Sequence, residues 1–318
     1  MTVVTGGTGF IGAHLLERFV SAGESVRALV RRKATLPRGV EPFTCDLAAG
    51  SGLEDALRGA TTVIHLAGVT KALRPADYYT GNVRVTENLA QALSGRDVRF
   101  VHVSSLAAIG PSQDGNPVHE DAEPRPLTHY GKSKLEAERT VRHMLPGAVI
   151  VRPPVVYGPR DTDVFQLLKS ISKGVVLEIA GGERWFSALY VKDLCEGLLA
   201  AARSPCAPGR AYFLAHAEPL SWSRLAAVAA RIMHRSPRVV RVPVPLAYAV
   251  GACAGLWSRL TGKPGIISRD KIREAVCAAW TCDATRSTAE LNFTATTSIE
   301  SGLSETLAWY KEAGWLTW

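Results

Sequence analysis

The sequence predicts an α/β fold: a doubly wound parallel sheet that carries a smaller, mostly helical C-terminal lobe. Two observations support this prediction. Short β-branched, apolar runs alternate with amphipathic helical stretches from residue 2 to Pro153, and short glycine-containing links join them. Strands of a parallel sheet are buried on both faces, which is why such runs are almost continuously apolar. Beyond Pro154 the alternation weakens into shorter mixed segments, which indicates a second unit.

The expected elements follow one another as strand, helix, strand. Strands are expected over residues 2–4, 25–30, 61–68, 98–105 and 148–153, and helices over residues 13–23, 52–60, 86–93 and 133–145. Later helices are expected over residues 221–233, 268–280 and 299–314. We therefore assign residues 1–160 to the large domain, to which residues 185–215 return with a further helix and strand. Residues 161–184 and 216–318 form the second, substrate-binding lobe.

Composition and charge narrow the classes of ligand. The 318 residues are 47% hydrophobic and 21% charged, which suffices for a sizeable core. The 37 basic and 29 acidic residues give a net charge of +8, which favours an anionic partner. Because the basic residues are scattered and lack interleaved aromatic residues, we expect a small-molecule ligand and no nucleic acid.

Cysteine spacing and the start of the sequence bear on metal content and location. The six cysteines form no C-x-x-C pair and no His-rich cluster, so we expect reduced thiols and no metal site. They are Cys45, Cys195, Cys206, Cys253, Cys277 and Cys282. A glycine-rich turn begins at residue 6 and leaves no room for a signal peptide, so we expect a cytoplasmic protein.

Residues 242–257 form a run of sixteen residues without a charge. Such a run is short for a membrane-spanning helix, and two interpretations remain open. We favour a buried helix, because runs of this length mostly lie in protein cores. A helix that rests on a membrane surface is the alternative.

A glycine-rich loop, "GGTGFIG", joins the first strand to the first helix. Gly9 and Gly12 complete a phosphate-binding pattern that begins at either Gly7 or Gly6. In a strand–turn–helix context these glycines allow a tight turn and close approach to a pyrophosphate at the helix N-terminus. The sequence therefore predicts a Rossmann-type dinucleotide site. Thr8, Phe10 and Ile11 belong to the same loop and are further candidate contacts.

The end of the second expected strand indicates which dinucleotide binds. An acidic residue there would accept hydrogen bonds from the ribose 2′-hydroxyl of NAD and repel the 2′-phosphate of NADP. The sequence has no acid between Glu24 and Glu41, and Arg31 and Arg32 occupy the expected position. An arginine can hold a phosphate through paired charge-assisted hydrogen bonds. We expect NADP(H), with NAD(H) as the alternative.

Six motifs in order give the chain a resemblance to a known family. They are "TGGTGFIG", "CDL" at 45–47, "HLAG" at 65–68, "VSSLAAIG" at 103–110, "YGKSK" at 130–134 and "VRPPVVYGPRD" at 151–161. In order and spacing they resemble the extended short-chain dehydrogenase/reductases, which include sugar-nucleotide epimerases, dihydroflavonol-type reductases and hydroxysteroid dehydrogenases. The resemblance covers nearly the whole chain and implies a nicotinamide-dependent enzyme.

Tyr130 and Lys134 are the candidate proton-transfer pair. Of the eight tyrosines, only Tyr130 has a lysine at the fourth following position. Positions i and i+4 share one helix face, so we expect the ammonium to lower the pKa of the phenol toward neutral pH. The resemblance implies that Tyr130 exchanges a proton with the substrate oxygen, that Lys134 also binds the nicotinamide ribose, and that Ser105 holds the reacting oxygen. Ser104 is then a cofactor-side neighbour.

The resemblance also implies further cofactor contacts and an assembly. The cofactor contacts are Asp46 and Leu47 near the adenine, Leu66, Ala67 and Gly68 along the cofactor backbone, and Pro153 and Val156 beside the nicotinamide. Asn82 is expected to support the helix of Tyr130, although a polar residue at a helix start would look the same. A homodimer would pack through helices that contain residues 82–93 and 130–144.

The substrate is the least determined part of the prediction. Trp185, Phe186 and Tyr157 suggest an apolar or ring-shaped substrate, although buried aromatic residues of a core would look the same. We favour hydride transfer to or from a hydrophobic, steroid-like or isoprenoid-like carbonyl or alcohol. A sugar-nucleotide epimerase or dehydratase, with Arg160 as a phosphate contact, is the first alternative. A non-catalytic NADP-sensing protein is the second.

Overall fold

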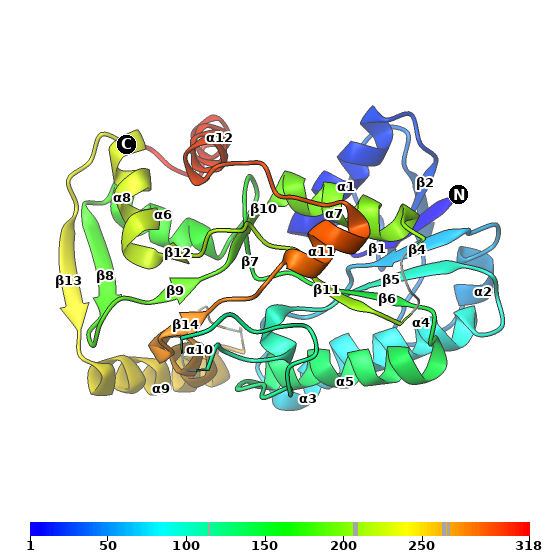
Figure 1. Cartoon of the computed structure of the whole chain (residues 1–318), viewed down its shortest axis with the longest axis horizontal. Coiled ribbons are helices and arrows are strands. Elements are labelled where there is room, and N and C mark those ends of the chain that lie inside the picture. The colour runs from blue at the N-terminus through cyan, green and yellow to red at the C-terminus, as the bar shows by residue number, and fades with distance from the viewer. Residues whose placement is uncertain (114, 206–208, 263–264, 266–267) are drawn as a thin grey trace.

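The computed structural model describes residues 1–113, 115–205, 209–262, 265 and 268–318, with the side chain of Arg259 left out. Figure 1 shows a parallel sheet with helices on both faces beside a smaller lobe of helices and short strands. The predicted α/β fold class is confirmed. The five described cysteines are free thiols, and the prediction for Cys206 falls outside the described residues.

Seven parallel strands form the large sheet. They are β1 (Thr2–Thr5), β2 (Val26–Val30), β3 (Glu41–Thr44), β4 (Thr62–His65), β5 (Arg99–Val103), β6 (Val149–Arg152) and β11 (Ala211–Phe213). Their order is β11-β6-β5-β4-β1-β2-β3, and all neighbours pair in parallel. The chain reverses its direction across the sheet between β1 and β4. Ligands of such sheets bind at this switch point, beyond the carboxyl ends of the strands.

Helices cover both faces of the sheet. One face carries α1 (Phe10–Ser21), α7 (Val191–Arg203) and α11 (Thr285–Leu291), and the other carries α2 (Leu53–Ala56), α4 (Val85–Leu93) and α5 (His129–Met144). Alternate strand residues enter opposite cores: Val4 packs in the core with Leu16, whereas Val3 packs with Leu89. All four side chains are fully buried.

The smaller lobe contains more strand than expected. Its helices are α6 (Val164–Ser172), α8 (Trp222–Ile232), α9 (Val244–Thr261), α10 (Arg269–Val276) and α12 (Ile299–Glu312). Its strands are β8 (Val175–Ile179), which pairs with β13 (Arg238–Val242), and β9 (Trp185–Phe186), which lies between β12 (Leu220–Ser221) and β14 (Ala279–Trp280). A further pair, β7 (Val155–Tyr157) and β10 (Ala188–Tyr190), and the short segments α3 (Pro75–Tyr79), η1 (Thr80–Arg84) and η2 (Leu106–Ala108) complete the described elements.

Three sequence expectations change. From residues 185–215, β11 joins the large sheet and α7 packs on its face, but β9 pairs with β12 and β14 in the smaller lobe. Strand β3 was not predicted, because it is an edge strand with one proline and little burial. The buried-helix interpretation of residues 242–257 is wrong: within this run only Ala247 and Gly251 are buried. No helix in the described part of the chain has the length and apolarity needed to cross a bilayer.

Candidate active site

The glycine-rich loop after β1 leads directly into the N-terminus of α1. Gly6 has a φ of +73°, which a residue with a side chain rarely adopts, and the amide of Gly9 donates to the carbonyl of Gly6 at 2.9 Å. Gly9 is the N-cap of α1 and has no side chain to occupy the first helical amides. Such a helix start attracts anions through its amides and its dipole.

Two glycines of this loop make a cradle that a side chain would fill. A Cβ atom on Gly12 would lie 2.2 Å from the carbonyl oxygen of Gly6, and one on Gly6 would lie 2.7 Å from the amide nitrogen of Ala67. The loop, α1 and the end of β4 therefore meet through backbone alone. This close backbone approach fits the pyrophosphate of a dinucleotide.

The loop after β4, residues 66–69, is held by Asn82, which lies in the π-helical turn η1. Its Oδ1 accepts from the amide of Val69 at 2.6 Å, and its Nδ2 donates to the Val69 carbonyl at 3.0 Å and to Ser133 Oγ at 2.8 Å. A Cβ on Gly68 would lie 2.8 Å from Asn82 Oδ1 and 3.9 Å from Lys134 Nζ. Asn82 thus ties this loop to α5 and is not a helix-start residue.

Ser105, Tyr130 and Lys134 come together beside this loop. Ser105 caps η2, its Oγ accepting from the amide of Ala107 at 3.1 Å, and its side chain lies close enough to that of Tyr130 to lower the phenol's pKa. Lys134 lies one turn along α5 from Tyr130, is 5% exposed, and donates from Nζ to the Val103 carbonyl at 2.7 Å. Gly131 permits this arrangement, because a Cβ there would lie 2.3 Å from the Ala107 carbonyl oxygen.

The pKa of Tyr130 differs from the sequence expectation. Burial raises it above its usual value, and the nearby Ser105 side chain acts in the opposite direction. Lys134 directs its ammonium at Val103, and burial lowers its own pKa to about 8. The expectation that Lys134 lowers the pKa of Tyr130 is therefore wrong for this structure. Sharing a helix face does not by itself bring the two polar groups together.

Glu138, one further turn along α5, anchors the helix to the sheet. Arg152 donates to both of its carboxylate oxygens, from Nε at 2.9 Å and from Nη2 at 2.6 Å, and the pair is almost fully buried. Ser104 Oγ donates to Glu138 Oε1 at 2.5 Å. The side chain of Ser104 thus faces Glu138, and its expected place beside the cofactor stays a prediction. The sequence carried a signal for this pair, because Glu138 continues the i, i+4 series of Tyr130 and Lys134.

A buried polar chain, missed in the sequence, lies behind the loop after β4. Thr5 Oγ1 is 2.6 Å from His65 Nδ1, and His65 Nε2 is 3.0 Å from Thr86 Oγ1. Thr5 Oγ1 also accepts from the amide of Ala67 at 3.1 Å. Burial lowers the pKa of His65 to about 3, with Lys134 adding to the effect, so the ring is neutral at pH 7. A neutral ring adds no repulsion to the buried ammonium.

Helix α10 of the smaller lobe borders Tyr130 from the opposite side. The amide of His129 donates to Asp270 Oδ2 at 3.1 Å, and Thr128 Oγ1 donates to Glu274 Oε1 at 3.1 Å. Lys271, on the same helix, pairs with Glu274 at 3.0 Å and its charge lowers the pKa of Tyr130. Sequence reasoning missed these residues, because no local pattern places α10 against α5.

The other predicted cofactor residues lie along the carboxyl edge of the sheet. Arg31 and Arg32 are exposed at the end of β2, and Asp46 is exposed after β3, where its Oδ1 accepts from the amide of Ala48 at 2.9 Å. Leu47 and Pro153 are buried, and the Pro153 carbonyl accepts from Leu106. Thr8 is exposed, and Phe10, Ile11, Leu66, Ala67 and Val156 are partly buried.

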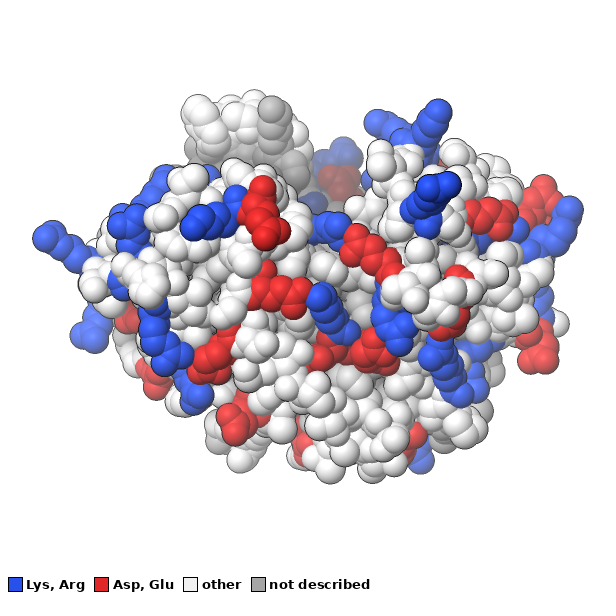
Figure 2. All heavy atoms as spheres, turned by 90° about the horizontal axis from the view of Figure 1, so that it is seen from above, with Lys and Arg blue, Asp and Glu red and all other residues white. Residues whose placement is uncertain are grey.

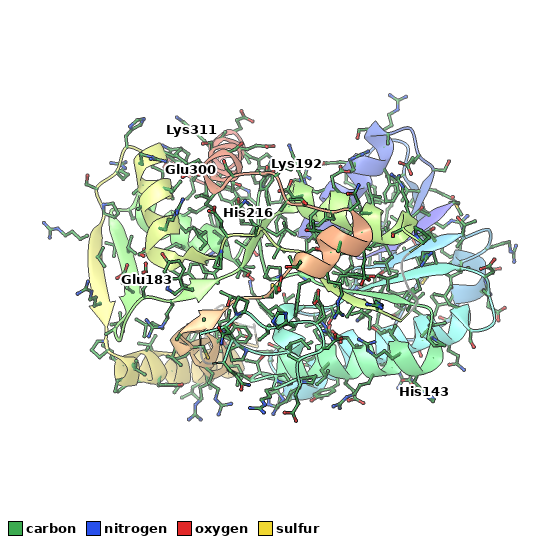
Figure 3. All side chains as sticks on the ribbon, viewed as in Figure 1. His143, Glu183, Lys192, His216, Glu300 and Lys311 are labelled. Carbon is green, nitrogen blue, oxygen red and sulfur yellow. The ribbon has the colours of Figure 1, made fainter. Side chains whose placement is uncertain are left out.

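Two of the predicted substrate residues are engaged elsewhere. Tyr157 is 3% exposed and packs under α12, where a Cβ on Gly302 would lie 2.6 Å from its hydroxyl. It borders a small cavity of about 90 Å³ together with His216 and Glu300. Glu300 belongs to α12, and Figure 3 shows His216 below that helix. Arg160 pairs with Glu17 at 2.7 Å. The buried Tyr157 is therefore a core residue, whereas the expected phosphate contact of the partly exposed Arg160 stays a prediction.

The aromatic pair of β9 is divided between core and surface. Phe186 is 1% exposed and stacks on Trp222 with ring centroids 4.1 Å apart, which makes it a core residue. Trp185 is 44% exposed and remains a candidate contact for an apolar molecule. Acidic and basic side chains are interspersed on the face that Figure 2 shows, with no broad basic groove there.

Comparisons with known proteins identify the class. The family of NAD dependent epimerases/dehydratases matches residues 2–215. The chain belongs to this family and, with it, to the extended short-chain dehydrogenase/reductases, which are NAD(P)-dependent oxidoreductases and epimerases. A nicotinamide dinucleotide is therefore the cofactor class of this site.

Three relatives act on different substrates by name. The chain is 32% identical to the ceramide reductase of Caulobacter vibrioides (strain NA1000 / CB15N), over 99% of this chain and 96% of that protein. It is 35% identical to a 4-hydroxy-2-methyl-3-oxo-4-farnesyl-3,4-dihydroquinoline-1-oxide ketoreductase of Stigmatella aurantiaca, over 69% of each. It is 28% identical to the N-acetyl-alpha-D-glucosaminyl-diphospho-ditrans,octacis-undecaprenol 4-epimerase of Escherichia coli O157:H7, over 96% and 93%.

A solved structure confirms the fold. MoeE5 in complex with UDP-glucuronic acid and NAD superposes with a TM-score of 0.79, at 23% identity, over 98% of this chain and 99% of that chain.

Proposed function

We propose that the protein is an NADP(H)-dependent oxidoreductase that transfers hydride between the nicotinamide and a carbonyl or secondary alcohol of a hydrophobic, lipid-like molecule. The observation that carries this proposal is that Ser105 lies beside Tyr130, with Lys134 one helical turn away, next to the glycine loop of Gly6 and Gly12. Proton-transfer groups are thus next to a dinucleotide site.

Each side chain has a role that follows from its chemistry. Ser105 and Tyr130 hold the reacting oxygen by hydrogen bonds, and Tyr130 gives its hydroxyl proton to that oxygen during reduction or accepts it during oxidation. The bound nicotinamide supplies or accepts the hydride. Lys271, whose charge lowers the pKa of Tyr130, favours the phenolate left when the proton moves, and Lys134 is the expected contact of the nicotinamide ribose. One carbonyl group, one hydride and one proton together give one alcohol.

The substrate class rests on the apolar parts of the relatives' named compounds. The ceramide reductase and the farnesyl-bearing ketoreductase both carry out a reduction by name, and ceramide and farnesyl groups are long and apolar. We infer that this chain reduces a carbonyl on a ceramide-type or similarly apolar lipid. The ceramide reductase supports this inference most strongly, because the similarity covers nearly the full length of both proteins.

The preference for NADP(H) rests on Arg31 and Arg32. Both are exposed at the end of β2, where a 2′-phosphate would need a cationic partner. NAD(H) is the alternative, since the similar MoeE5 structure contains NAD.

A second candidate is epimerisation of a sugar linked to a carrier. The undecaprenol-linked epimerase covers nearly the whole chain and favours this alternative. An epimerase would retain its cofactor and show no net oxidation. A binding protein without turnover has no need of Ser105, Tyr130 and Lys134 together.

The test is a fluorescence titration of the purified protein with NADPH and NADH, followed by NADPH oxidation assays with oxo-lipids of the ceramide type. We expect reversible binding with a preference for NADPH, and turnover with a long-chain ketone. Tightly retained NAD, no NADPH preference and no net oxidation would contradict the proposal and favour the epimerase.

A further inference from the structure

Helix α9 turns its large apolar side chains to the outside. Leu246, Val250, Trp257 and Leu260 are 54%, 45%, 69% and 74% exposed, and Cys253 between them is exposed as well. Steps of four and three residues place all five on one helix face. We call them the α9 stripe.

The inward face of α9 is made of small residues. Ala247 is 5% exposed, and a Cβ on Gly251 would lie 2.7 Å from Ile272 Cγ1 and 3.3 Å from the Ser268 carbonyl oxygen at the start of α10. An ordinary surface helix buries its large apolar residues and exposes polar ones. Helix α9 does the opposite, which marks the stripe as a contact surface.

The charge around α9 is one-sided. Residues 219–269 contain eight Lys and Arg and no Asp or Glu, so the rest of the chain holds 29 of each sign. The basic residues are scattered here as elsewhere, but the segment lacks acids, so it carries the whole net charge of +8. Arg238 and Arg241 are exposed on β13, directly before α9, and Arg269 and Arg273 are exposed on α10, which packs against it. Arg241 lies 4.0 Å from Glu178 and Arg273 lies 3.5 Å from Asp270, whereas neither Arg238 nor Arg269 forms an ion pair with a residue that the structure describes.

We propose that the α9 stripe docks on the surface of a lipid bilayer that contains anionic lipids. An apolar helix face flanked by basic residues enters the headgroup region by burying apolar area, and its cations are attracted to the negative surface. Helix α9 cannot span the bilayer, so it lies along it. Figure 1 shows α9 and α10 together along one edge of the smaller lobe, which leaves the outer side of α9 free to meet a flat surface.

Docking would bring the active site close to the bilayer. Helix α10 packs against α9 and is hydrogen-bonded through Asp270 and Glu274 to the segment just before Tyr130. A molecule that leaves the bilayer beside α10 would therefore reach Tyr130 after a short path. The docking inference itself does not require the proposed reaction, because it rests on the stripe and the surrounding charge.

The experiment is co-flotation of the purified full chain with two kinds of vesicle, one of phosphatidylcholine and phosphatidylglycerol in equal parts and one of phosphatidylcholine alone. The variants are Trp257→Glu and Leu260→Glu, both at strongly exposed positions that leave the fold intact. Gln91→Glu, at an exposed position of α4, makes the same change of charge elsewhere. Circular dichroism and sedimentation record folding and oligomeric state.

We expect wild-type protein and Gln91→Glu to bind the anionic vesicles, and each stripe variant to bind at least about tenfold more weakly. Added salt should weaken binding, and neutral vesicles should bind poorly. Absence of vesicle binding, or an equal loss in Gln91→Glu, would overturn the proposal. So would a wild-type dimer that Trp257→Glu converts to monomers without any vesicle binding, which would assign the stripe to a second copy of the chain.

Discussion

Arg152 donates two hydrogen bonds to the carboxylate of Glu138, at 2.9 and 2.6 Å, inside the core of the protein. The pair joins the helix of Tyr130 and Lys134 to strand β6. Because both charges are buried, each depends on the other for its compensation. This contact therefore fixes the position of Tyr130 and Lys134 relative to the sheet.

Glu138→Gln should strongly destabilise the protein. It leaves the Arg152 guanidinium without its charge partner, at a cost of about 3–5 kcal/mol in the free energy of unfolding. The matched control is Glu136→Gln on the same helix, which breaks an exposed pair with Arg139 and should cost less than about 1 kcal/mol. Urea denaturation measures both. Equal effects would show that the buried pair does not anchor α5.

Gly12→Ala should impair cofactor binding. The added Cβ would lie 2.2 Å from the Gly6 carbonyl oxygen, so the loop must shift away from its phosphate-binding form. We expect the dissociation constant for NADPH to rise at least about tenfold in a fluorescence titration. Gly255→Ala is the control. Gly255 lies in α9, and an added Cβ there would have no neighbouring atom within 4 Å in the described part of the chain, beyond the backbone of its own helix. Unchanged NADPH affinity in Gly12→Ala would show that the glycine loop does not bind the cofactor.

Lys134 should make stability depend on alkaline pH. Its pKa is about 8 in the folded protein and 10.5 in the unfolded chain, so the unfolded state binds more protons between these values. Stability therefore rises with pH across this window, and below pH 8 the buried ammonium costs about 3 kcal/mol. Relative to Lys134→Met, wild-type protein should gain this amount between pH 7 and pH 10.5.

Thermal or urea unfolding at several pH values measures the difference, with Lys132→Met on the exposed side of the same helix as control. A constant difference between wild-type protein and Lys134→Met over this range would contradict the burial argument.

Arg31→Ala should weaken NADPH binding by about ten- to a hundredfold and leave NADH binding nearly unchanged. The guanidinium would contact only the 2′-phosphate, which NADH lacks. Arg96→Ala, at another exposed arginine, is the control for general loss of positive charge. A parallel loss for both nucleotides would show that Arg31 does not distinguish them.

Local patterns predicted the parts of the site that neighbours in sequence build. The glycine loop and the i, i+4 placement of Tyr130 and Lys134 are local, and the structure places both as the sequence suggested. The direction in which each side chain points was not readable: Lys134 turns to Val103, and Ser104 turns to Glu138. These outcomes depend on burial and on partners from other strands.

Contacts between distant segments account for the rest. Asp270 accepts a hydrogen bond from the backbone amide of His129, 141 positions away in the sequence. No periodicity in either segment predicts this contact. Tyr157 looked available for a substrate, but α12 covers it in the fold. Helix α9 carried an apolar signal that sequence reasoning assigned to the core, because the spacing of its large and small residues gives no sign of which face is outside.

The proposed reaction depends on proton transfer by Tyr130, which is tested by comparing NADPH oxidation by wild-type protein, Tyr130→Phe and Tyr79→Phe with one long-chain ketone of the ceramide type. Removing the Tyr130 hydroxyl removes the proton donor but leaves the dinucleotide loop intact. We predict that Tyr130→Phe loses at least about a hundredfold in kcat with NADPH affinity within about twofold of wild type, whereas Tyr79→Phe stays active. Wild-type turnover in Tyr130→Phe would contradict the account.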